Sequence, residues 1–299
     1  MKSLRRLRLF FCAILLGHAA FAASAELPLV NMGFYLPAIR EASMADLKIS
    51  LGVWVDELAK PYGVRINATT YDDMAAMRRA LDRAELNFIN APGMELAEVF
   101  KPEEIRQGYA RRHYGIDEGL VLVVANTSGL SRFADLAGKR LSYLSADRLT
   151  EYFMETQCLK TAGRNCRDFL TMKEEKRDIQ SVYNVFFGRS DAALVNLSTL
   201  RTAEELNPQV RQKLKVILDW KAKAVYFGMM TRHTEERFRG LILRSTAEAM
   251  KSVRGRQLLE LFKTDYLEPV DADALQPYWA LLREYRELEA KLSKQKKLP

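Results

Sequence analysis

Polar side chains that could bind a small solute follow the ends of predicted strands and precede predicted helices. In the first third of the chain these are Tyr35, Tyr71 and Asn90. In the middle third they are Ser145, Asp147, Arg148, Thr150, Asn196 and Ser198. Loops after strands and the amino ends of helices meet at one edge of an α/β sheet, which is where clefts form. The predicted chemistry is hydrogen bonding to a small polar or anionic ligand.

Arg148 is the most informative of these candidates, because a cation in the first turn of a helix opposes the positive end of the helix dipole. An anionic group of a ligand would offset this charge through a bidentate contact. An ion pair with Glu151, three residues along the helix, would do the same, and the sequence leaves both open. The other candidates also have structural alternatives. The tyrosines could be half-buried core rings, Asn90 a turn residue, and Ser145 or Asp147 a helix cap.

Residues typical of catalysis are missing from the sequence. It has no Gly-x-Ser-x-Gly motif, no glycine-rich phosphate loop and no cluster with metal-ligand spacing. Asp117 and Glu118 adjoin a predicted strand and are expected to be turn residues. We therefore expect a binding protein without a cofactor or metal, and an enzyme only as a second alternative.

The first 25 residues have the layout of a secretory signal peptide. Four basic residues precede an apolar run at 9–17, and the small-residue sequences 20–22 and 23–25 follow. The apolar run is shorter than the roughly 20 residues that span a membrane. Cleavage is predicted near Ala25, which places the mature protein in the periplasm. Removing the four positive charges of this segment lowers the net charge from +8 to +4. The sequence contains no basic stripe with interleaved aromatic residues, so nucleic-acid binding is not predicted.

Two cysteines, Cys158 and Cys166, remain after the signal peptide. Thiols this close in sequence form disulfides in an oxidising compartment, and Gly163 between them could end a helix and let the chain reverse. Free thiols and a metal site are the alternatives. Only His113 and His233 remain as further metal ligands, and neither has ligand spacing.

Strand-like and helix-like segments alternate along the chain, which predicts an α/β fold with mainly parallel sheets flanked by helices. Strands are predicted at 29–35, 64–70, 86–90, 119–125, 138–144, 192–195, 214–218 and 223–230. Helices are predicted at 44–60, 72–84, 94–99, 130–136, 147–162, 179–187 and 206–213, and from 234 to the end. We predict two lobes joined by a two-strand hinge: residues 26–121 with 222–299, and residues 122–221. The ligand is expected between the lobes of a monomer.

Three segments resemble the periplasmic phosphate/phosphite/phosphonate solute-binding proteins of ABC transporters. They are residues 81–92, 130–140 and 182–193. The resemblance implies a type 2 periplasmic-binding fold that closes on a ligand and delivers it to a permease in the inner membrane. The alternative partner is a membrane sensor kinase or similar receptor.

The ligand loop departs from the family's pattern. Where the family has a Ser-Thr-Ser-Gly run at a helix start, this chain has residues 148–151, in which only the hydroxyl of Thr150 remains and Glu151 would repel an oxyanion. The family's His before the next helix is also missing, and the local residues are Lys176, Arg177 and Asp178. The sequence therefore predicts a ligand other than a phosphonate.

Overall fold

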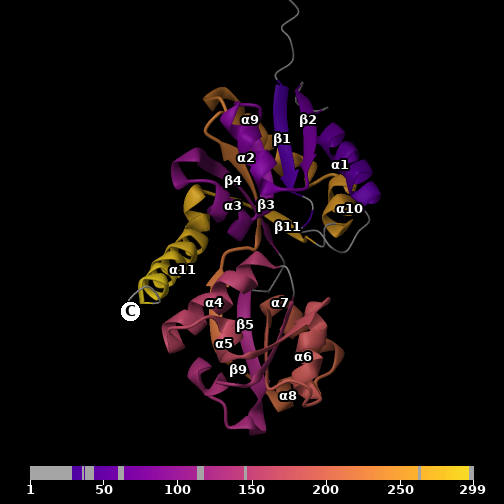
Figure 1. The fold of residues 1–299 in the computed structure, drawn as a ribbon. Coiled ribbons are helices and arrows are strands. Elements are labelled where there is room, and N and C mark those ends of the chain that lie inside the picture. The colour runs from indigo at the N-terminus through magenta and orange to yellow at the C-terminus, as the bar shows by residue number, and fades with distance from the viewer. Residues whose placement is uncertain are drawn as a thin grey trace, which may run out of the picture.

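The fold contains two β-sheets with helices on both faces of each (Figure 1). The computed structural model describes residues 29–35, 37, 44–59, 64–112, 118–144, 147–261 and 264–295. The predicted signal peptide, Ser145, Asp117 and His113 lie outside the described residues.

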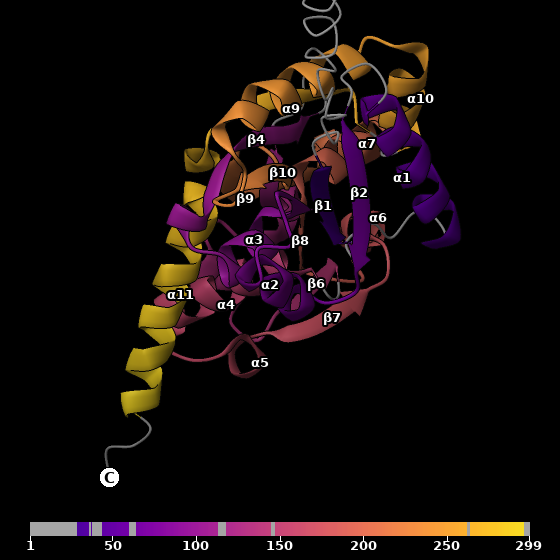
Figure 2. The ribbon, with the colours of Figure 1, turned by 90° about the horizontal axis from the view of Figure 1, so that it is seen from above.

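The first sheet has the strand order β11-β4-β10-β3-β1-β2. Its strands are β1 (Leu29–Tyr35), β2 (Arg65–Tyr71), β3 (Phe88–Pro92), β4 (Ile105–Arg112), β10 (Tyr226–Thr231) and β11 (Tyr266–Val270). Its helices are α1 (Met44–Ala59), α2 (Met74–Asp82), α3 (Gly93–Val99), α9 (Glu236–Ala249), α10 (Val253–Leu261) and α11 (Gln276–Gln295). Figure 2 shows α9 and α10 on one side of this sheet and α2 and α3 on the other.

The second sheet has the strand order β7-β6-β8-β5-β9. Its strands are β5 (Glu118–Ala125), β6 (Arg140–Leu144), β7 (Thr171–Glu175), β8 (Ala192–Asn196) and β9 (Leu214–Ala222). Its helices are α4 (Arg148–Ala162), α5 (Cys166–Phe169), α6 (Asp178–Phe186), α7 (Leu197–Leu206) and α8 (Gln209–Lys213). The long apolar run of β5 fits this position, because Leu122 packs on the α4 face and Val123 packs on the α6 face.

Strand pairing in both sheets is mixed, which corrects the prediction of mainly parallel sheets. Strand β1 pairs in parallel with β2 and β3, and β6 pairs in parallel with β7 and β8. All other pairings are antiparallel. The antiparallel strands arise where the chain passes from one sheet to the other without a crossover helix. Strand β9 leads through residues 223–225 directly into β10, which enters the first sheet between β3 and β4.

Several predicted elements differ from those observed. The C-terminal region is not helical throughout, because β11 pairs with β4 at the edge of the first sheet. Strands β4 and β7 were not predicted. The predicted helix at 206–213 corresponds to α8, and α7, which ends at Leu206, was not predicted. Pro208 separates the two helices, because it lacks the N–H that a continuous helix needs.

Helix α11 packs against both α3 and α4, so it contacts both halves of the molecule (Figure 1). Near its start, Tyr278 and Trp279 are buried. The Trp279 indole donates a hydrogen bond to the Phe100 carbonyl at 3.1 Å, and the Tyr278 hydroxyl donates to the Ala224 carbonyl. Further along, Glu284 forms an ion pair with Lys160 of α4 at 3.0 Å.

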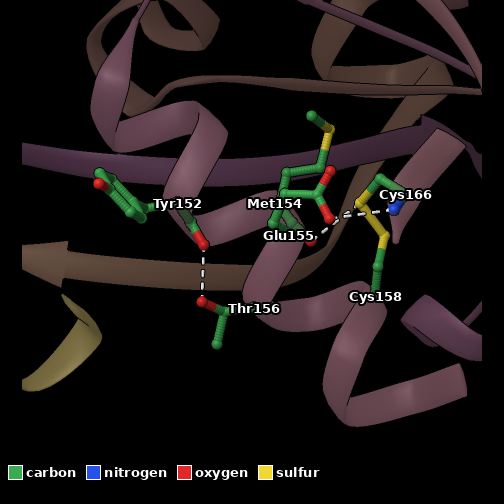
Figure 3. The surroundings of a disulfide bond; sticks show 6 residues. All are labelled: Tyr152, Met154, Glu155, Thr156, Cys158 and Cys166. Atoms are coloured by element: carbon green, nitrogen blue, oxygen red, sulfur yellow. Dashed lines mark hydrogen bonds between the residues drawn. A yellow bond between two sulfur atoms is a disulfide. The ribbon is translucent and has the colours of Figure 1, made fainter. Parts of the chain in front are cut away.

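The predicted disulfide between Cys158 and Cys166 is confirmed. It joins the end of α4 to α5, with a Cα–Cα distance of 5.3 Å, and both residues are fully buried (Figure 3). Gly163 ends α4 in the left-handed conformation at φ 62°, so the chain reverses as predicted. The Cys166 amide then donates to the Glu155 carboxylate at 3.1 Å, which fixes the start of α5 against α4.

Candidate functional site

The parallel strands of the two sheets end toward one another, and helices begin at these ends. In the first sheet, β3 leads directly into α3. In the second sheet, β6, β7 and β8 are followed by α4, α6 and α7, whose amino ends lie toward the first sheet (Figure 1). A parallel sheet binds ligands at the carboxyl ends of its strands, where backbone N–H groups and loop side chains are available. The region between the two sheets is therefore the candidate site.

The structure brings the three candidates of the first sheet to one edge. Tyr35 and Tyr71 are the last residues of β1 and β2, and they pair directly in register. Asn90 on the neighbouring β3 is buried, and its Nδ2 donates to the Gly33 carbonyl at 3.3 Å. Tyr226 at the start of β10 was not predicted, but its hydroxyl donates to the Tyr35 carbonyl at 3.2 Å.

On the second sheet, two side chains at the start of α4 bond to each other. Thr150 is buried, and its hydroxyl donates to Asp147 Oδ2 at 2.6 Å. Asp147 is the N-cap residue, as the sequence allowed, and its carbonyl accepts the Glu151 amide at 3.0 Å. The Thr150 hydroxyl is therefore used within the protein.

Arg148 joins the helices of the two sheets. Its Nε donates to Glu98 Oε2 on α3 at 3.2 Å, and its Nη2 donates to Glu98 Oε1. Its Nη1 donates to Glu151 at 3.2 Å, so the ion pair within the helix is also present. The Tyr152 hydroxyl adds a donor to Glu98 Oε1 at 2.8 Å. Two carboxylates therefore neutralise the Arg148 guanidinium, for which the sequence also allowed a contact with an anionic ligand.

Asp178 at the start of α6 is the central polar residue of the second sheet's edge. Its Oδ2 accepts hydrogen bonds from the Asn196 amide at 2.9 Å, from Asn196 Nδ2 at 3.0 Å and from the Thr199 hydroxyl at 2.9 Å. Its Oδ1 is buried and has no partner among the residues that the structure describes. Burial raises the pKa of Asp178 to about 6, and the charge of Asp147 raises it further.

Two further predicted candidates, Asn196 and Ser198, lie near Asp178 in the fold or at the start of the helix that Asn196 precedes. Asn196 holds the Asp178 carboxylate with both its backbone and its side chain. Ser198 lies in the first turn of α7, half-buried, and its carbonyl accepts the Thr202 hydroxyl at 3.1 Å. The sequence signal for Asp178 was a carboxylate where the resembling family has a histidine, immediately before a predicted helix.

Glu95 lies in the first turn of α3. Its carboxylate is buried, which raises its pKa to about 7, and the neighbouring charge of Asp147 raises it further, while Arg148 opposes the shift. Glu95 forms no ion pair within the described part of the chain. The charge of Asp147, a predicted candidate, thus acts on both Glu95 and Asp178, and neither of these two was a predicted site residue.

The fold is a two-sheet α/β protein whose candidate ligand region lies between the sheets. Residues 40–275, most of the chain, match the family described as ABC transporter, phosphonate, periplasmic substrate-binding protein. The chain belongs to this family of periplasmic substrate-binding proteins, which confirms the resemblance seen in the sequence. A search among curated proteins returned no match.

Solved structures of low identity show the same type 2 periplasmic-binding fold. A Xanthomonas citri protein bound to ATP has a TM-score of 0.63 at 11% identity, covering 88% of this chain and 98% of its own. A Prochlorococcus marinus protein in complex with methylphosphonate has a TM-score of 0.56 at 15% identity, covering 87% and 98%. A binding component of a Pseudomonas aeruginosa ABC phosphonate transporter has a TM-score of 0.52 at 13% identity, covering 91% and 100%.

Two kinds of feature are absent from the described residues. Within them, no helix is long and apolar enough to cross a membrane. Across the same ranges, no group of three or more His, Cys, Asp or Glu side chains is arranged to hold a metal ion.

Proposed function

We propose that this protein is exported to the periplasm, closes on a small polar ligand between its two sheets, and delivers that ligand to an ABC permease in the inner membrane. The proposed lobes are those expected from the sequence, residues 26–121 with 222–299, and residues 122–221. The proposed signal peptide ends near Ala25. Membership of the substrate-binding family supports the proposal.

The observation that carries the proposal is the buried Oδ1 of Asp178, to which none of the described residues donates a hydrogen bond. A buried acceptor without a donor costs about 1–3 kcal/mol, and native proteins rarely leave one so. In a substrate-binding protein, a donor supplied by the ligand offsets this cost. The ligand-contacting residues that we propose are Tyr35, Tyr71, Asn90, Ser145, Asp147, Arg148, Thr150, Asn196 and Ser198, with Asp178 added.

Charge at the site favours a polar ligand over a phosphonate. Arg148 is neutralised by Glu98 and Glu151. Asp178 and Glu95 form no ion pair with the described residues, so their ionised carboxylates would repel an oxyanion. The family's usual ligand class therefore does not transfer to this chain on the residues present.

The test is to identify the solute that the protein carries. The mature protein is purified from periplasmic extract and unfolded in denaturant, and the released small molecules are identified by mass spectrometry. We expect one solute per chain, chemically unchanged, which rebinds to the stripped and refolded protein with one-to-one stoichiometry. Recovery of no solute, together with no rebinding from the extract, would contradict the proposal. Recovery of a converted product would favour the enzyme alternative.

A receptor role in signalling is the second candidate, and the divergent loop at 147–151 favours it. The two roles differ in which membrane protein reads the closed form. Solute-loaded protein should raise the ATPase rate of a reconstituted permease in the first case, and the autophosphorylation rate of a sensor kinase in the second. Light scattering of the same sample tests the expected monomer.

A further inference from the structure

A cavity of about 90 Å³ lies against one face of the first sheet. Side chains from β1, β3, β4, β10 and β11 form its floor, and Leu51 of α1, Thr246 of α9 and Leu259 of α10 form its roof. Figure 2 shows α9 and α10 on this side of the sheet. The volume is about three times the roughly 30 Å³ that a water molecule occupies in the liquid, and native interiors contain few voids larger than one water.

Gly228, on an internal strand of the sheet, leaves part of the floor without a side chain. It pairs with Asn90 on β3 and with Tyr109 on β4, and all three residues line the cavity. A Cβ at this position would lie 2.6 Å from Asn90 Oδ1 and 2.8 Å from Phe88 Cε1, so a larger residue would displace both side chains. The hollow therefore depends on a glycine in the strand pairing itself.

Polar groups on the wall already have partners within the protein. The Tyr109 hydroxyl donates to the Leu243 carbonyl. The Tyr226 hydroxyl donates to the Tyr35 carbonyl at 3.2 Å, and Asn90 Nδ2 donates to a backbone carbonyl of β1 at 3.3 Å. The apolar side chains of the wall are Met32, Phe34, Leu51, Phe88, Leu259 and Leu267. Since a buried water needs about two to four polar partners, an apolar occupant suits these walls better than water does.

Arg111 is the one charged residue on this wall in the described ranges. Its guanidinium lies 5.0 Å from the centroid of the Tyr226 ring. Its charge also acts on the buried carboxylate of Glu118, because burial raises the pKa of Glu118 and Arg111 opposes that shift. A ring face and a carboxylate therefore already attract the guanidinium, and an occupant of the cavity needs no negative charge.

Solvent reaches the cavity from the end of the first sheet that faces the second. Tyr226 begins β10 at this end, directly after residues 223–225, which connect it to β9. Tyr226 and Gly228 are only half-buried, although β10 lies between β3 and β4 within the sheet. A small molecule can therefore enter this cavity while the protein stays folded.

We infer that this cavity is a binding site for a small uncharged apolar molecule, with one ring or a short branched chain inside it. Burial of carbon surface against the aromatic and aliphatic walls drives the binding. The inference goes beyond the proposed function, because all of the described lining residues belong to the first sheet and the segments that cover it.

Three probes of similar size separate an apolar site from a charged one. They are benzene, butyrate and butylammonium, and the melting temperature of the mature protein is measured by calorimetry with each. A ligand that binds only the folded state raises this temperature, and we expect a rise of about 2 °C or more in benzene-saturated buffer and none with the two ions. No rise with benzene overturns the inference, and so does a rise with either ion that equals or exceeds the rise with benzene.

A pair of matched variants assigns the binding to this cavity. Leu267→Trp places a larger side chain at the wall, and we expect it to weaken benzene binding about 10-fold or more. Leu218→Trp is the control, because Leu218 is also a half-buried leucine on an edge strand, β9 of the second sheet, and should bind benzene as the wild type does. Wild-type benzene affinity in Leu267→Trp overturns the inference.

A second variant covers the case in which Leu267→Trp does not fold by circular dichroism. Leu51→Ala enlarges the cavity from the roof, so naphthalene should raise the melting temperature of this variant more than that of the wild type. Equal rises overturn the inference.

Xenon locates the site independently of any variant. A crystal of the protein pressurised with xenon should show a xenon atom within about 4.5 Å of Phe34, Phe88 and Leu51. A crystal that binds no xenon at these residues overturns the inference. The proposed function is tested separately by the released solute, so either result here leaves it standing.

Discussion

The ion pair between Glu98 on α3 and Arg148 on α4 connects the helices of the two sheets, so its energy measures how firmly the halves are held together. The perturbations are Glu98→Ala, Arg148→Ala and the double substitution, which form a double-mutant cycle. Glu151→Ala with Arg148→Ala forms a matched cycle, because Glu151 binds the same guanidinium from within α4. Only the first cycle isolates a coupling between helices of the two sheets, because Glu98 lies on α3 and Glu151 lies on α4 with Arg148.

The magnitude follows from exposure and geometry. The Arg148 side chain is 41% exposed and that of Glu98 is 27% exposed, so the pair is neither fully solvated nor buried. Solvent-exposed pairs contribute about 0.2–1 kcal/mol. Two nitrogens of Arg148 contact both oxygens of Glu98, which places this pair at the upper end of that range. We expect a coupling of about 1 kcal/mol with Glu98, and about 0.3–0.5 kcal/mol for the i,i+3 pair with Glu151.

Urea unfolding followed by far-ultraviolet circular dichroism gives the free energies of unfolding for both cycles. A Glu98–Arg148 coupling near 1 kcal/mol that exceeds the Glu151–Arg148 coupling supports the contact. A value below about 0.3 kcal/mol for Glu98, or a larger one for Glu151, would refute the assignment of Arg148 to the contact between the sheets.

Three further predictions concern packing, the disulfide and pH. Gly108→Ala places a Cβ 2.0 Å from the Gly228 carbonyl oxygen on the paired strand and should lower the free energy of unfolding by about 3 kcal/mol, whereas Gly52→Ala, in open space on α1, should raise it by about 0.5–1 kcal/mol. Replacing Cys158 and Cys166 by Ser opens a loop with a sequence separation of 8 and should cost about 2.5 kcal/mol by denaturant unfolding. Burial raises the pKa of Glu95 to about 7 in the folded state, so its contribution to stability is fully present below its unfolded pKa and is lost as pH rises through 7. Glu95→Gln should therefore remove a stability difference between pH 5 and pH 8 of up to about 3 kcal/mol, and an unchanged pH profile would show that Glu95 titrates normally.

Local hydrophobic patterns predicted the strands and helices in which the pattern of apolar residues runs without interruption. The run of β5 is apolar because both faces of this strand are covered. Asp73 caps the start of α2 and Gly163 ends α4, as their residue types predict. Strand β11, at an edge of the first sheet, lacks these signals. Strand β11 contains Glu268 and Pro269, which are unfavourable in a central strand but tolerated at an edge, so its sequence resembles a loop.

A feature of the candidate site could be predicted only where one continuous segment of the chain supplies all of the residues that form it. The position of Asn90 within β3 and the N-cap position of Asp147 follow from local sequence. The partner of Arg148 does not, because Glu98 is 50 residues away and meets it only when the sheets come together. The same holds for the field of Asp147 on Glu95 and Asp178, which depends on how three separate helices converge.

Closure of the two sheets on a solute is measured most directly by small-angle X-ray scattering of the stripped protein, with and without the solute released from cells. At saturation we predict a smaller radius of gyration, because the sheets approach each other around the ligand. Full occupancy by calorimetry with an unchanged radius of gyration would contradict closure on a solute between the sheets.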